Sequence, residues 1–173
     1  NWADSGLSMT NRFIAVHALG FAWHNMLHLT NWVVNGMPER FPRLKTVWIE
    51  SGLAWLPFMM QRLDNEYMMR TSEAPLLKRK PSEYIRGPQY FQSIQLHEGE
   101  LSLRHALEAL GDDTLMFATD FPHSESWFPK SVEVILGWTS ISEAARRKLL
   151  WDNAARCYRR YGARIVDSKH QGA

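Results

Sequence analysis

Short runs rich in β-branched and aromatic residues alternate along the chain with longer segments of helical character. The runs are residues 45–49 (KTVWI), 90–96 (YFQSIQL) and 115–118 (LMFA), and a helical segment follows each of them. Strands that alternate with helices in this way lie parallel, because each helix carries the chain back across the sheet. The alternation therefore predicts an α/β fold with about three parallel strands and flanking helices.

Three strands cannot close such a sheet. With their helices they amount to half of a (β/α)8 (TIM) barrel, and an open half would leave a sheet edge unpaired on each side. The chain also opens with Asn1 rather than with a methionine. We therefore expect residues 1–173 to be the C-terminal part of one barrel domain. A missing N-terminal part, from the same gene product or a separate chain, would supply the other strands.

The composition argues against several classes of protein. A chain that is 45% hydrophobic and 22% charged folds around a core rather than staying disordered. The net charge of +2, without a basic stripe interleaved with aromatic residues, does not favour nucleic acid as a partner. The single cysteine, Cys157, excludes an internal disulfide and fits the reducing cytoplasm.

Residues 13–37 carry no charged side chain and are long enough to raise the question of a membrane span. The run nevertheless contains three histidines and three asparagines, each of which is costly in hydrocarbon. We expect a buried helix over residues 13–34 instead, apolar nearly all round and stopped at Gly36. No membrane association is predicted.

The histidines of this helix, His17, His24 and His28, are spaced by seven and four residues and share one face. Two histidines four apart on a helix can bind a metal, but Asn25 replaces the glutamate of the H-E-x-x-H motif. The favoured interpretation is a buried helix whose imidazoles hydrogen-bond to neighbouring backbone groups. A helical haem or metal binder is the alternative.

Acidic residues follow two of the predicted strands. Glu50 comes directly after residues 45–49, and Asp120 comes soon after residues 115–118, three residues before His123. A carboxylate at the C-terminal tip of a buried strand, close to an imidazole, suggests a metal or proton-transfer site. The structural alternative is a cap, since aspartate is common at helix and turn starts.

Four sequence blocks together carry a family resemblance. In chain order they are FPRLKTVWIESGLAWLP, QRLD, LMFATDFPH and KLLWDNAARCY. They resemble the C-terminal half of the amidohydrolase superfamily, in the subgroup of aminocarboxymuconate-semialdehyde decarboxylase and related decarboxylases and hydrolases. The resemblance implies a metal-dependent (β/α)8 barrel whose strands six, seven and eight are present here, with catalytic residues at the strands' C-terminal ends.

The resemblance also implies roles for individual residues. Asp120 matches the strand-eight aspartate, which binds a single divalent metal, Zn or Mn, or takes the proton from the metal-bound water. Glu50 stands where many relatives have a histidine as general acid and base. A glutamate can shuttle that proton if burial raises its pKa, or it can bind the metal. We expect His123, Gln95 and Trp55 to touch the substrate or to support the residues that do.

The implied protein is a metal-dependent hydrolase or decarboxylase acting on a small carboxylated, aromatic or carbonyl compound in the cytoplasm, and a homo-oligomer is compatible with it. The family's His-x-His of strand one has no counterpart in this chain. This chain alone should therefore be inactive, and the N-terminal half of the barrel would complete the site. The alternative is a non-catalytic barrel relative, or a half-barrel that serves as an assembly partner.

Overall fold

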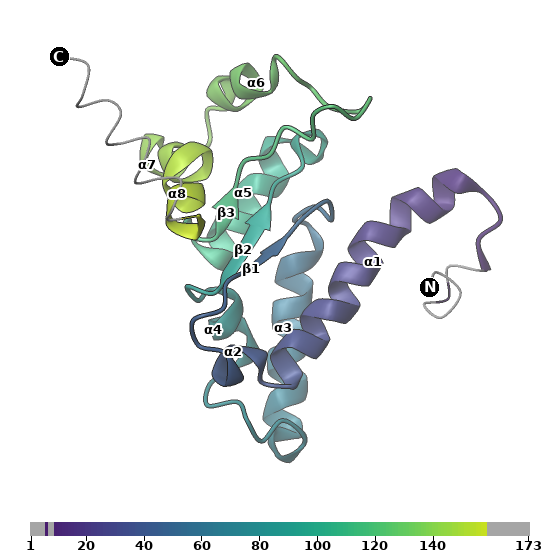
Figure 1. Ribbon diagram of the computed structural model, residues 1–173, viewed down its shortest axis with the longest axis vertical. Coiled ribbons are helices and arrows are strands. Elements are labelled where there is room, and N and C mark those ends of the chain that lie inside the picture. Colours follow the sequence, from purple (N-terminus) through teal and green to yellow (C-terminus); the bar gives the residue numbers. More distant parts are fainter. Residues whose placement is uncertain (1–5, 7–8, 159–173) are drawn as a thin grey trace.

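The computed structural model of the chain describes residue 6 and residues 9–158 (Figure 1). Its strands are β1 (Thr46–Trp48), β2 (Tyr90–Ser93) and β3 (Leu115–Met116). They form a parallel sheet in the order β1-β2-β3, with Thr46 opposite Tyr90 and Gln92 opposite Leu115. The predicted α/β class with three parallel strands is therefore confirmed.

Helices surround this sheet and connect its strands. In the described residues they are α1 (Phe13–Val34), α2 (Met37–Arg40), α3 (Trp55–Met69), α4 (Pro81–Ile85), α5 (Gly99–Leu110), α6 (Ser131–Gly137), α7 (Glu143–Arg147) and α8 (Asn153–Cys157). Two 3-10 turns, η3 (Thr71–Glu73) and η4 (Leu96–Glu98), and a π-turn, η5 (Lys148–Asp152), complete the set. Helices α3 and α4 cross from β1 to β2, and α5 crosses from β2 to β3, as the alternation predicts.

All three strands are shorter than predicted, β1 by one residue at each end. All four residues of β2 are buried, as expected for a central strand covered on both faces, but the strand ends at Ser93 and η4 begins at Leu96. In β3 the pairing stops at Met116. The next backbone N–H, of Phe117, donates to the carbonyl of Leu149 in η5 (3.0 Å) rather than to a strand. A backbone hydrogen bond to η5 thus replaces strand pairing at the end of the predicted third strand.

An aromatic cluster joins the C-terminal end of α1 to the sheet. The ring centroids of Trp32 and Trp48 lie 6.2 Å apart, and those of Trp48 and Tyr90 lie 6.1 Å apart. Such aromatic pairs contribute about 0.5–1.5 kcal/mol each beyond the area they bury. Leu29 and Val33, both fully buried, extend this packing along α1.

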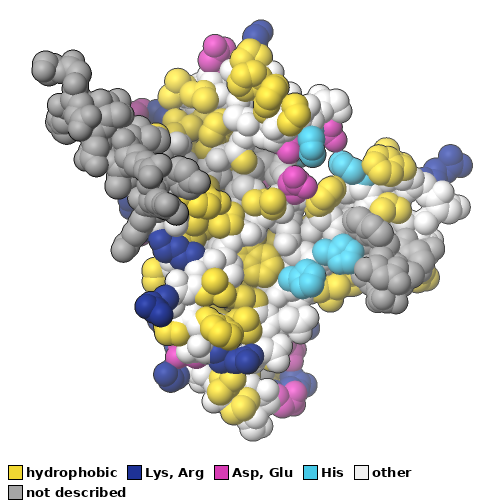
Figure 2. Space-filling model, viewed as in Figure 1, with side chains coloured by type: hydrophobic (Ala, Val, Ile, Leu, Met, Phe, Trp, Pro, Cys, Tyr) yellow, Lys and Arg dark blue, Asp and Glu magenta, His cyan; other side chains and the backbone are white. Residues whose placement is uncertain are grey.

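The first part of α1 differs from the prediction. The helix over residues 13–34 is confirmed, but most of its apolar side chains outside the C-terminal end are exposed, namely Phe13, Ile14, Leu19, Phe21, Trp23 and Leu27. Figure 1 shows this end of α1 pointing away from the sheet, and Figure 2 shows hydrophobic side chains spread over the surface. The prediction that α1 is buried is therefore wrong for its first part. The described residues pack mainly against the C-terminal end of the helix. No helix in residues 9–158 is both long and apolar enough to cross a bilayer.

The apolar spacing over residues 140–160 predicts one helix, or two joined helices, with Ser140 or Ser142 as the N-cap. In the structure, α7, η5 and α8 follow one another without a break. Ser142, one of two predicted N-caps, accepts a hydrogen bond from the backbone N–H of Ala145 (3.1 Å). The predicted helix runs to Arg160, and its last two residues lie outside the described part of the chain.

Asn153 ties this segment to the start of β3. Its buried amide donates to the carbonyls of Asp112 and Leu115, both at 2.8 Å. In Asn153→Leu both carbonyls lose their donor, so we expect the free energy of unfolding to fall by about 2–4 kcal/mol. Urea denaturation of the full-length protein measures this loss. Asn65→Leu, at an exposed position on α3, is the control and should change stability by less than about 0.5 kcal/mol. A loss below about 1 kcal/mol for Asn153→Leu would contradict the assigned role.

Candidate active site

Both predicted strand-end carboxylates stand in a left-handed backbone conformation. Glu50 follows β1 and Asp120 follows β3, and both have φ of 59°. Among the described residues other than glycine, they alone have positive φ. This conformation costs roughly 1–3 kcal/mol at a non-glycine residue, and such strain concentrates at functional sites. The fold thus holds both carboxylates in an unfavourable backbone geometry at the C-terminal ends of two strands of the sheet.

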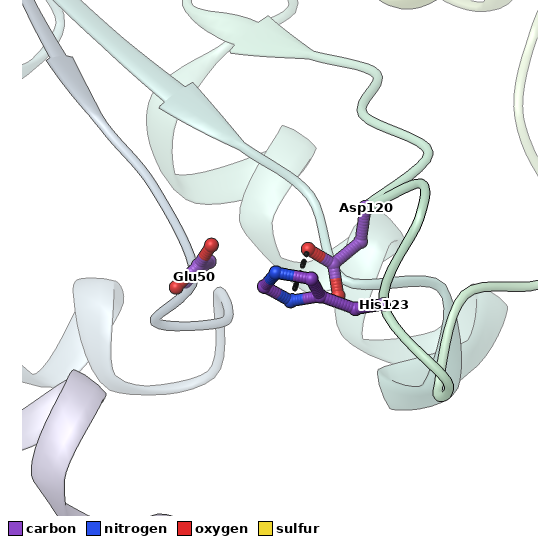
Figure 3. A group of neighbouring side chains, drawn as sticks. All are labelled: Glu50, Asp120 and His123. Carbon is purple, nitrogen blue, oxygen red and sulfur yellow. Dashed lines mark ion pairs between the residues drawn. The ribbon is translucent and has the colours of Figure 1, made fainter.

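Glu50 and Asp120 converge with His123. One ligand atom from each of the three side chains lies within 4.8 Å of the other two, and His123 Nδ1 is 3.5 Å from Asp120 Oδ1. Figure 3 shows Asp120 and His123 on the loop after β3, facing Glu50 on the loop after β1. Carboxylate oxygens and imidazole nitrogens are donors that Zn and Mn accept. The donor set therefore fits a divalent metal ion.

A cavity of about 360 Å³ opens beside this cluster, within the range of sites for small molecules. Besides the three clustered side chains, Gln95, two residues after β2, and His17 from α1 line it. Figure 2 shows acidic and histidine side chains gathered on one part of the surface. The predicted residues Gln95 and His123 thus face the cavity, and their contact with substrate stays a prediction.

Side chains of β2 hold the loop that carries Glu50. The hydroxyl of Ser93 accepts a hydrogen bond from the backbone N–H of Glu50 (3.4 Å). The fully buried amide of Gln92 donates to the carbonyl of Gly52 (3.3 Å) and accepts from the hydroxyl of Tyr90 (2.8 Å). Burial raises the pKa of the Tyr90 hydroxyl well above its usual value, so this hydroxyl remains a donor. The sequence pattern did not indicate this buried polar support.

Glu98 holds the same loop from the cavity side. Its carboxylate accepts hydrogen bonds from the backbone N–H of Leu53 (2.9 and 2.7 Å) and of Ala54 (3.2 Å), at the start of α3. Helix starts expose such unpaired donors, and a carboxylate is favourable there. The indole N–H of Trp55, which is buried, donates to the carbonyl of Ser51 (2.8 Å). Trp55 does not line the cavity, so the contribution that the structure supports is the hydrogen bond to the loop.

Gly52 allows Glu98 to approach the loop. Its φ is +72°, and an added Cβ atom would lie 2.7 Å from Oε1 of Glu98. We expect Gly52→Ala to lower the free energy of unfolding by about 2–4 kcal/mol, since it adds backbone strain and displaces the carboxylate from its N–H partners. Gly111→Ala is the matched control, because Gly111 has φ of +82° with nothing within 4 Å of its added Cβ. Equal losses in thermal or urea unfolding of the two variants would contradict the role of Glu98.

Two of the three histidines of α1, His17 and His28, differ from the favoured interpretation. His17 and His28 are exposed rather than buried among backbone groups, and only His17 of the three lines the cavity. His17 Nε2 lies 3.7 Å from Oε1 of Glu125 on the loop after β3. In the described part of the chain the three imidazoles do not form a metal-binding group, so the helical metal-binder alternative gains no support. No sequence motif links His17 to Glu125, and only the tertiary fold brings them together.

The comparisons with known proteins agree with this geometry. The model of the amidohydrolase family matches residues 9–160. The chain therefore belongs to the amidohydrolase family, which confirms the resemblance carried by the four sequence blocks.

Several relatives are decarboxylases. Gamma-resorcylate decarboxylase of Polaromonas sp. strain JS666 is 29% identical over 146 residues, which cover 80% of this chain and 41% of that protein. The crystal structure of 5-carboxyvanillate decarboxylase from Sphingomonas paucimobilis matches with 32% identity and a TM-score of 0.63, covering 75% of this chain and 38% of that one. A dihydroxybenzoic acid decarboxylase of Polaromonas sp. JS666, solved with bound manganese and the inhibitor 2-nitroresorcinol, matches with 25% identity and a TM-score of 0.63, covering 78% and 39%. The chain thus spans about two-fifths of the length of these relatives.

Proposed function

We propose that the full-length protein containing this chain is a metal-dependent carboxy-lyase that removes CO2 from a small aromatic carboxylate. The observation that carries the proposal is the convergence of Glu50, Asp120 and His123 within 4.8 Å, after two strands of one parallel sheet. The decarboxylases of resorcylate, carboxyvanillate and dihydroxybenzoate among the relatives support this reaction over hydrolysis.

We further propose that Asp120 is a ligand of one divalent ion, with His123 or Glu50 beside it. The manganese in the dihydroxybenzoic acid decarboxylase supports manganese, and the same donors accept zinc. Such an ion, when bound, supplies a Lewis acid that polarises a substrate oxygen. The remaining ligands would come from the rest of the barrel.

The protein side chains would handle the proton. In decarboxylation the bond between the ring carbon and the carboxyl carbon breaks, CO2 leaves, and the electron pair stays on the ring carbon, which takes up a proton. We assign the delivery of that proton to the carboxyl group of Glu50, which regains it from solvent. The hydrogen bond from its backbone to Ser93 holds Glu50 at the cavity. His123 orients Asp120, and the amide of Gln95 would donate to a substrate oxygen.

In the full-length protein, residues 1–173 would form the C-terminal part of a single barrel domain. The N-terminal half would supply the strands that pair with the outer edges of β1 and β3, and the length of the relatives supports this arrangement. The single cysteine supports a cytoplasmic location. Assembly into a homo-oligomer stays a prediction.

A substrate panel tests the proposed function. The full-length protein, loaded with Mn or with Zn, is given hydroxylated aromatic acids, the corresponding esters and ring-cleavage products, and CO2 and product are measured. We expect CO2 from at least one hydroxylated aromatic acid. If an ester is turned over and no acid releases CO2, the protein is a hydrolase and not a decarboxylase. Absence of all turnover in a protein that binds no metal would favour the non-catalytic barrel relative.

A further inference from the structure

His17 reaches the cavity from α1, an element that carries none of the three clustered side chains. It lines the same cavity as Glu50, Asp120 and His123. Phe21, one helical turn further along α1, also lines it. A donor and an aromatic ring from α1 therefore face the space beside the cluster.

Neighbouring rings hold the imidazole of His17. Its ring centroid lies 5.3 Å from that of Phe13 and 5.3 Å from that of Phe21, in tilted and edge-on arrangements that aromatic rings prefer. The side chain is nevertheless 45% exposed. The imidazole is thus oriented by its own helix while its nitrogen remains accessible from the cavity.

The partner of His17 is a carboxylate that can be exchanged. Oε1 of Glu125 lies 3.7 Å from Nε2 of His17, and the Glu125 side chain is 51% exposed. Exposed ion pairs of this kind are worth only about 0–1 kcal/mol. Glu125 also accepts a hydrogen bond from the hydroxyl of Ser124 (2.7 Å), which would remain if His17 turned to another acceptor. A substrate anion can therefore replace Glu125 at low cost.

Two other ionisable groups around the cavity already have protein partners, whereas the Gln95 amide, assigned above to a substrate oxygen, is uncharged. The carboxylate of Glu98 accepts from the start of α3, and His123 lies against Asp120. The cavity also carries several acidic side chains, so an anionic ring compound needs a donor away from the cluster. His17 provides one, since an imidazole carries at least one N–H donor in either protonation state.

We propose that His17 is a substrate-binding residue that determines specificity. Its N–H donates to an acidic oxygen on the substrate ring other than the carboxylate that is lost, at the position that Glu125 occupies opposite it in the free protein. Phe21 provides the apolar surface beside that ring. This inference rests on the proposed function, because it takes the substrate to be a small aromatic acid.

Binding of two unreactive ring compounds tests the proposal without turnover. The probes are 2-nitroresorcinol, with two hydroxyl groups, and 2-nitrophenol, with one, titrated calorimetrically into the metal-loaded full-length protein. We expect His17→Leu to weaken 2-nitroresorcinol about tenfold and 2-nitrophenol less than about twofold, since one charged hydrogen bond is lost. His17→Gln keeps a donor and should restore part of the affinity. Glu125→Gln should tighten 2-nitroresorcinol binding by about threefold, because it removes the competing anion.

Matched variants decide the outcome. His28→Leu lies on the same helix outside this cavity and should leave both affinities unchanged. Equal losses for the two probes in His17→Leu would overturn the proposal. So would a loss in His97→Leu instead of His17→Leu, or no binding of 2-nitroresorcinol by the unmodified protein. Failure of the proposed function gives a different result. In that case no aromatic acid releases CO2, while the affinities for the ring probes still differ between His17→Leu and His28→Leu.

Discussion

Asp120→Asn should leave the full-length protein folded and lower its kcat/KM by more than about a thousandfold, because an amide replaces a charged metal ligand or base. Asparagine is the informative replacement, since it tolerates the left-handed backbone of this position (φ 59°) better than alanine does. Metal affinity should fall by at least about a hundredfold, because loss of a residue that only hydrogen-bonds to a metal ligand already lowers metal affinity by about 10–100-fold. Elemental analysis after dialysis, steady-state kinetics and thermal unfolding measure the three quantities.

Asp113→Asn is the matched control at the opposite end of β3. Asp113 precedes the strand and pairs with Lys148 (3.1 Å) and Arg156 (3.4 Å), and the hydrogen bond from Lys148 is the main reason that its pKa is lowered. In (β/α)8 barrels this end of the strands serves stability, whereas the C-terminal end serves catalysis. We expect Asp113→Asn to cost less than about 1 kcal/mol of stability and to keep metal and turnover. Unchanged metal content and activity in Asp120→Asn would remove Asp120 from the site.

The positions of the two carboxylates at strand ends could be predicted from the sequence because their signal is local. Glu50 and Asp120 each follow a short apolar run, and parallel strands bring such positions to one edge of a sheet. His123 and Gln95 also line the cavity, and each lies close in sequence to the end of a strand, His123 after β3 and Gln95 after β2. The alternation of strands and helices therefore predicts well at which ends of the strands the candidate site residues lie.

Contacts between distant segments could not be predicted in this way. Glu98 binds the start of α3, 45 residues earlier, and His17 meets Glu125 across more than half of the chain. Neither pair has a periodic pattern or a motif, because each depends on how helices pack beside the sheet. The prediction that α1 is buried failed for a related reason. An apolar composition shows that a helix needs a packing partner but not where that partner lies.

Glu50→Gln separates the two roles that the sequence left open for Glu50. If Glu50 delivers the proton, the isosteric amide should lower kcat by about 10²–10⁴-fold while metal content and KM change little. If Glu50 is instead a metal ligand, metal content should fall as in Asp120→Asn. Its partial burial and its distance from the other two side chains, within 4.8 Å, allow both roles.

The control for this variant is Glu98→Gln, which lines the same cavity but contacts backbone N–H groups. An amide at Glu98 still accepts a hydrogen bond from Leu53, so we expect a loss of stability of about 1–2 kcal/mol and a much smaller loss in kcat. Equal kinetic losses in the two variants would mean that Glu50 acts only through the shape of its loop. A loss in kcat confined to Glu50→Gln, with metal retained, would instead leave this carboxyl as the proton donor, because the loop and the metal would both be unchanged.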